Sequence, residues 1–188
     1  VAINYDRVLE DRVLIAAAAR GDRRFGARIS VMVGFILRKF WQGLRGRYVR
    51  FGTAAVAFGH PLSLKDFGPD KPIEELADVL MHRIAEAMPV LVVPLISQHL
   101  RNARGPLPQE DIATLVAKDA DRLGAYMPQQ TPQELAESVN SALQRMQRNR
   151  IVEEGPEGWQ IKSGEEAVAD YYANSVADRF EAERAVAE

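Results

Sequence analysis

The first clear pattern in this chain is a pair of short apolar stretches. The stretch Val1–Tyr5 predicts a short buried strand, and Tyr48–Phe58 predicts a second one, with Val56 and Phe58 on one face. Gly59 and Pro61 end the second strand, because glycine permits a turn and proline cannot donate a ladder hydrogen bond. The residues that follow, Leu62–Leu64, are therefore expected at the rim of a sheet.

Most of the remaining chain has apolar residues at three- and four-residue steps, which predict helices. The helix predicted at Ala27–Trp41 is apolar well beyond a single stripe. The others are expected at Asp6–Ala19, Ile73–Met88, Val90–Leu100 (kinked or started by Pro94), Gln109–Leu123, from Thr131 to about Arg148, and after Ser163.

The last third has its own local signals. Thr131-Pro-Gln-Glu134 is a capping box that opens a helix. The turn cluster Gly155–Gly158, between two short apolar runs, predicts a hairpin, and Ser163 is expected to cap the last helix. The order helix, helix, hairpin is typical of a winged helix.

A linker at Asn102–Pro108 divides the two halves. We therefore expect residues 1–104 to be the rear part of an α/β domain. Residues 105–188 would be a mostly helical, winged-helix-like module with a short hairpin.

Charge is unevenly distributed, although the net charge is only −2. Nine bases between Arg23 and Lys65 have no acidic residue among them, whereas acids outnumber bases from Asp66 onward. The predicted helix ends in Leu37-Arg-Lys-Phe-Trp41, which mixes bases with aromatic rings. Such a helix suits a membrane interface, but a core helix with a solvated basic end has the same pattern.

A nucleic-acid role is disfavoured by charge. The bases of the Thr131 helix and its end lie at the far end (Arg145, Arg148 and Arg150), and the hairpin carries Glu153, Glu154 and Glu157. Binding to nucleic acid requires a basic face that neutralises phosphates. We predict no nucleic-acid partner and favour a winged-helix-shaped interaction module as the alternative.

No motif for catalysis stands out. The chain has no cysteine, and His60, His82 and His99 lack neighbours that suggest metal binding, so no metal or cofactor is predicted. His60 follows a strand end, where it could act as a base, but an ordinary rim histidine before proline is the favoured interpretation. Asp6 and Glu10 share a helical face that we expect to be solvated.

Two stretches resemble the C-terminal half of the glycerol-3-phosphate acyltransferase family. Ala2-Ile-Asn-Tyr-Asp-Arg-Val-Leu-Glu10 resembles the family's apolar strand running into Tyr-Glu-x-Val-x-Glu. Phe51-Gly-Thr-Ala-Ala-Val-Ala-Phe-Gly-His-Pro-Leu-Ser-Leu64 resembles its Phe-Gly-x-Val-x-Val-x-Phe-Gly-Glu-Pro-x-x-Leu strand, with His60 in place of the usual Glu. Asp170–Phe180 resembles the family's terminal helix more loosely.

The resemblance implies an enzyme of phospholipid biosynthesis that transfers an acyl group from acyl-CoA or acyl carrier protein to glycerol 3-phosphate. The family's catalytic His-x4-Asp pair is absent here, so this segment is expected to be inactive alone and to supply scaffold and membrane contact. The chain opens mid-pattern without Met, so we expect a missing N-terminal part of the same protein. By resemblance, Ile3 and Tyr5 would lie nearest the acyl pocket.

We expect a peripheral location on the cytoplasmic face of the cell membrane, in contact with anionic lipid. The predicted membrane contacts are Arg38, Lys39, Phe40, Trp41, Arg45 and Arg47. A lysophospholipid or another acceptor in place of glycerol 3-phosphate is an open alternative, as is a non-catalytic interaction or nucleic-acid-binding module.

Overall fold

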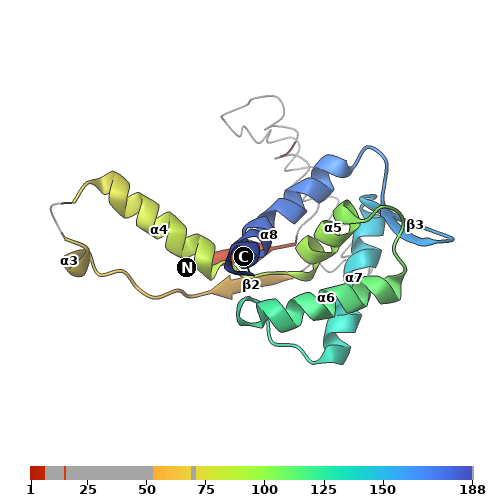
Figure 1. Ribbon diagram of the computed structural model, residues 1–188, viewed down its shortest axis with the longest axis horizontal. Helices are drawn as coiled ribbons and strands as arrows, with labels where there is room; N and C mark the ends of the chain where they lie inside the picture. The colour runs from red at the N-terminus through yellow and green to blue at the C-terminus, as the bar shows by residue number, and fades with distance from the viewer. Residues whose placement is uncertain (7–14, 16–52, 69–70, 188) are drawn as a thin grey trace, which may run out of the picture. The chain divides into compact units, whose positions relative to one another are not determined.

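The structure, a computed structural model, describes residues 1–6, 15, 53–68 and 71–187 (Figure 1). These residues form a mixed α/β protein with a largely helical C-terminal part. Residues Val1–Asp6 and Thr53–Glu188 belong to one compact unit. The helices predicted at Asp6–Ala19 and Ala27–Trp41 lie almost entirely outside the described residues.

The two predicted strands pair with each other. Strand β1 (Ala2–Tyr5) runs antiparallel to β2 (Ala54–Ala57), with Ile3 directly opposite Val56. On one face of this small sheet Ala2 is buried, and the Asn4 Nδ2 donates to the Pro89 carbonyl at 2.7 Å. Ile3 and Val56 occupy the other face.

The two longer helices that follow β2 differ in burial. After the short α3 (Leu64–Phe67), α4 (Ile73–Ala87) has no buried residue. The next helix, α5 (Val92–Asn102), is mostly buried and is bent by 85° from α4. Pro94 lies in the first turn of α5, where proline is tolerated, so it starts the helix rather than kinking it.

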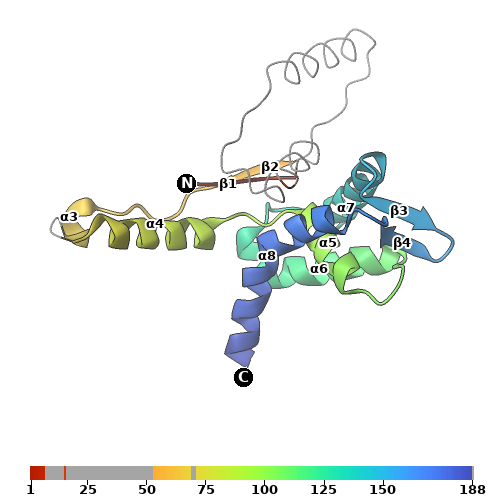
Figure 2. The same ribbon diagram turned by 90° about the horizontal axis from the view of Figure 1, so that it is seen from above.

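The core lies in the C-terminal part. There α5 packs against α6 (Gln109–Leu123), α7 (Pro132–Arg148) and α8 (Glu166–Ala187), and the most extensive of these contacts is with α8 (Figure 2). The short 3-10 helix η1 (Gly124–Tyr126) follows α6. The largest fully buried side chains include Leu95, Ile96, Ile112, Leu143, Met146 and Ile151. Thus α5, placed before the predicted linker, contributes to the same core as the helices after it.

The capping box and the hairpin are both confirmed. The Thr131 side chain accepts from the Glu134 N–H, and the Glu134 carboxylate accepts from the Thr131 N–H. Strands β3 (Val152–Gly155) and β4 (Gly158–Ile161) form the hairpin. Leu107 forms an isolated bridge to β4, because its N–H and carbonyl pair with the Trp159 backbone at 2.9 and 2.8 Å.

The prediction that Ser163 caps the last helix is wrong. Helix α8 begins at Glu166, and the chain first turns at Gly164, which has a φ of 87°. The Glu166 carboxylate accepts the Gly164 N–H at 3.1 Å. Hydrogen bonds from the backbone N–H groups of Glu166 and Gly164 lower the pKa of that carboxyl, so the helix start uses an acidic side chain of its own first turn.

Helix α8 also holds the end of α4. The Arg179 guanidinium donates to the Ala85 and Glu86 carbonyls at 2.7 and 2.6 Å, and it lies over the Tyr126 ring at 3.9 Å. The terminal carbonyls of a helix have no partner within the helix, so a cation is favourable there.

In the part of the chain that the structure describes, no single helix is long and apolar enough to cross a bilayer. Only α4 and α5 together meet that criterion, across their bend.

Candidate functional site

The two stretches that carry the family resemblance meet in one apolar surface. It consists of Val1, Ile3, Tyr5, Val56 and Phe58, and we call it the apolar sheet face. Ile3 is 60 % exposed and Val56 53 % exposed, so the expectation that Val1–Tyr5 is a buried strand is wrong for this face. Alternation shows that a face is apolar but does not show what covers it.

The apolar sheet face supplies hydrophobic contact rather than acid–base chemistry. Its side chains are apolar except for the Tyr5 hydroxyl. A surface of this kind suits an acyl chain or another part of a protein, because several large apolar side chains are exposed on it. The predicted substrate contacts Ile3 and Tyr5 are thus on one face, two residues apart.

His60, the low-ranked candidate base, lies beyond the end of β2 and is exposed. Within the described residues no hydrogen bond or ion pair orients its imidazole. The segment beside it is held from α4, since the Arg83 guanidinium donates to the Pro61 carbonyl at 3.3 Å. A general base works best when a partner fixes its ring, so this geometry favours an ordinary rim histidine.

A second histidine, His99, contacts a carboxylate that the sequence pattern did not predict as its partner. The His99 Nε2, in the last turn of α5, lies 2.6 Å from the Asp119 Oδ2 of α6. Asp119 is buried, and its other oxygen lies 3.7 Å from the Arg122 guanidinium. A carboxylate of this kind fixes an imidazole ring. Ser97, two residues before His99, has a buried hydroxyl with no partner in the described part of the chain, but residues two apart on a helix do not face each other.

Asp6 contradicts the expectation of a solvated face. It is 2 % exposed, and its carboxylate accepts from the Arg145 guanidinium at 2.6 Å and from the Thr53 N–H. Burial raises the pKa of the Asp6 carboxyl, and this effect exceeds the lowering by Thr53 and Arg145. The pair ties the end of β1 to α7. Its proposed neighbour Glu10 lies outside the described residues.

The predicted membrane contacts lie outside the described residues; they are Arg38, Lys39, Phe40, Trp41, Arg45 and Arg47. Among the residues that are described, no group of three or more His, Asp or Glu side chains is arranged to hold a metal ion.

Comparison with known protein families, with curated proteins and with solved structures gave no match.

Proposed function

We propose that this chain is the C-terminal part of a glycerol-3-phosphate acyltransferase, and that it supplies scaffold and membrane-surface contact. One observation supports this beyond the motif resemblance. The two resembling stretches, far apart in sequence, are hydrogen-bonded neighbours with Ile3 opposite Val56. Two motifs that contribute to one site are expected to be neighbours in space.

The apolar sheet face has a physical role in the proposed enzyme. In the complete enzyme it would be covered by the missing N-terminal part of the protein and by the acyl chain, with Ile3 and Tyr5 lining the chain's path. A sheet of two short strands has little stability of its own and gains from further packing. Acyl-CoA or acyl carrier protein would be the donor.

Catalysis in this account comes from the His-x4-Asp pair of the missing part. The 188-residue chain alone should therefore transfer no acyl group from acyl-CoA to glycerol 3-phosphate above background. Turnover by the isolated chain would contradict the proposal, and loss of that turnover in His60→Ala would identify the base that had been overlooked.

Membrane contact is tested by sedimentation with anionic vesicles. We expect binding that weakens with salt and in the variant Arg38→Glu/Lys39→Glu. Each base near the surface contributes about 1 kcal/mol, so reversing two should weaken binding by roughly 30-fold or more. The matched control is Arg148→Glu/Arg150→Glu, on α7 and after its end, which should bind nearly normally. Equal loss in both variants would show that no particular stretch contacts the membrane.

A second candidate is a winged-helix-like interaction module. The order α5, α6, α7, β3, β4, with the Leu107 bridge to Trp159 before α6, supports this candidate because it resembles the order of a winged helix. DNA binding is a poor fit, because Arg145 is engaged by buried Asp6 and the hairpin is acidic. Binding to duplex DNA without binding to vesicles would favour this candidate over the acyltransferase.

A further inference from the structure

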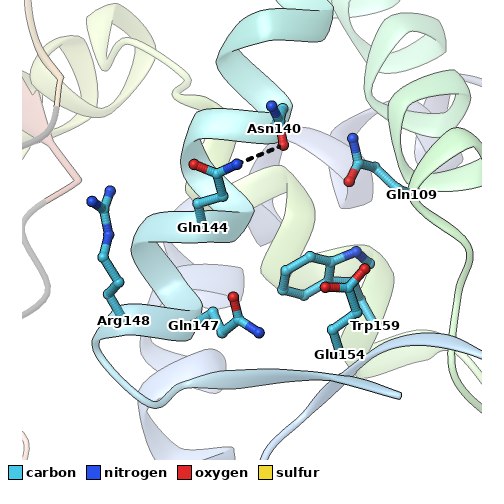
Figure 3. Close-up of a pocket in the computed structure, with 7 residues that line it drawn as sticks. All are labelled: Gln109, Asn140, Gln144, Gln147, Arg148, Glu154 and Trp159. Carbon is cyan, nitrogen blue, oxygen red and sulfur yellow. Dashed lines mark hydrogen bonds between the residues drawn. The ribbon is translucent and has the colours of Figure 1, made fainter. Parts of the chain in front are cut away.

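A polar pocket lies between α7, the start of α6 and the β3–β4 hairpin (Figure 3). Its volume is about 470 Å³, within the range of small-molecule sites. Trp159 and Glu154 are direct cross-strand partners, so their side chains share the hairpin face that lines the pocket. Four carboxamides line the rest of it: Gln109, Asn140, Gln144 and Gln147.

In the described part of the chain, the side chains that line this pocket make few hydrogen bonds with one another. Between its described side chains the one hydrogen bond runs from the Gln144 Nε2 to the Asn140 Oδ1, at 3.3 Å. The Trp159 Nε1 is buried and has no hydrogen-bond partner among the described residues, and Figure 3 shows it on the side of the ring nearer Gln109. A buried donor without a partner is unusual in a folded protein, and a ligand carbonyl that reached this donor would satisfy it.

The charges of the pocket are balanced and separated. Arg148 and Glu154 both line it, and Figure 3 shows Arg148 on the left side of the pocket and Glu154 on the right side, next to Trp159. A phosphate dianion would be repelled by Glu154, and an apolar ligand would leave the carboxamides unpaired. The lining therefore fits a ligand with an anionic group at one end, a cationic group at the other and both donors and acceptors between them.

We propose that this pocket binds a short peptide with free ends. Its terminal carboxylate would pair with the Arg148 guanidinium, which suits bidentate contact, and its terminal ammonium would pair with Glu154. Each peptide group offers one donor and one acceptor, which the carboxamides of Asn140, Gln144 and Gln147 can match. A peptide carbonyl would accept from the Trp159 N–H.

The test uses Trp159 as its own reporter. The chain has two tryptophans, so Trp41→Phe leaves Trp159 as the single fluorophore. Titration with trialanine should change its emission saturably. Trialanine with an acetylated N-terminus and an amidated C-terminus should bind at least about tenfold more weakly, because each charge-assisted hydrogen bond is worth a factor of ten or more.

Variants distinguish the pocket from a general surface effect. Arg148→Gln and Glu154→Gln should each weaken trialanine binding about tenfold or more, whereas the neighbouring exchanges Arg150→Gln and Glu157→Gln should not. The changed side chains are all exposed, and circular dichroism should confirm that each variant folds. Absence of saturation at about 10 mM trialanine, equal binding of the blocked peptide, or saturable binding of glycerol or inorganic phosphate in its place would overturn the proposal.

Discussion

Replacing Arg145 by methionine is expected to lower the free energy of unfolding by about 3–5 kcal/mol at neutral pH. The guanidinium is the cation 2.6 Å from the Asp6 carboxylate, whose side chain is 1 % exposed. Methionine keeps much of the volume but leaves a buried carboxylate without its counter-charge. Urea unfolding of the variant and the parent chain measures the difference.

The loss of unfolding free energy in Arg145→Met should be larger at neutral pH than at acidic pH. Burial already raises the pKa of Asp6 in the folded chain, so the folded state holds this proton more tightly than the unfolded chain. The protonated Asp6 carboxyl therefore stabilises the folded chain at pH values below its pKa in the unfolded chain. This stabilisation is lost as pH rises through the pKa of Asp6 in the folded chain. Removing Arg145 raises the folded pKa further. The deficit of Arg145→Met should therefore be largest at neutral pH and shrink toward about pH 4.

Two further variants test whether the loss of stability comes from the Asp6–Arg145 pair. Adding Asp6→Asn to Arg145→Met should recover part of the lost stability, because it removes the uncompensated charge. Arg148→Met, on the same helix but exposed, should change stability by less than about 0.5 kcal/mol. A loss below about 1 kcal/mol in Arg145→Met, without dependence on pH, would show that the pair does not hold β1 to α7.

The second large effect is expected at Gly158, where alanine should cost about 3 kcal/mol or more. A Cβ there would lie 2.4 Å from the carbonyl carbon and oxygen of Leu107, and the φ of 129° is strained for any other residue. Backbone atoms cannot rotate away as a side chain does. The paired hydrogen bonds between Leu107 and Trp159 should therefore be lost first.

Amide hydrogen exchange at Leu107 and Trp159 measures this locally, and urea unfolding measures the total effect. The matched control is Gly155→Ala on the same hairpin. There the nearest atom to the added Cβ is 3.8 Å away and the φ is not in the left-handed region, so stability should change by less than about 1 kcal/mol. Equal effects at the two glycines would contradict the close approach of Leu107.

Local signals in the sequence predicted the C-terminal part closely. Thr131 and Glu134 lie within one helical turn of each other, so their reciprocal capping can be read directly and α7 begins at Pro132 as expected. The turn residues Gly155–Gly158 fixed the hairpin in the same way. The prediction that Ser163 caps the last helix failed because the chain turns at Gly164, before the helix begins.

Contacts between distant residues could not be predicted from local pattern. Asp6 and Arg145 are 139 residues apart, and His99 and Asp119 come from different helices. The neighbourhood of Asp6 in sequence suggests a solvated helix face, whereas a partner on α7 buries it. For the candidate site, the family resemblance singled out Ile3 and Tyr5, and the β1–β2 register puts both on one face of the sheet. The resemblance did not reveal that this face is exposed in the described part of the chain, since burial depends on what packs against it.

Our central proposal is that this chain supplies scaffold and membrane-surface contact to an acyltransferase. The catalytic His-x4-Asp pair would lie in a further, N-terminal part of the same protein. The most direct test of this proposal is acyl transfer from acyl-CoA to glycerol 3-phosphate by a polypeptide that extends upstream of Val1. We predict a His-x4-Asp pair in that extension, turnover by the extended protein, and strong loss of turnover in Ile3→Asp but not in Glu157→Gln. An extended protein without that pair, or one in which Ile3→Asp has full activity, would contradict the account.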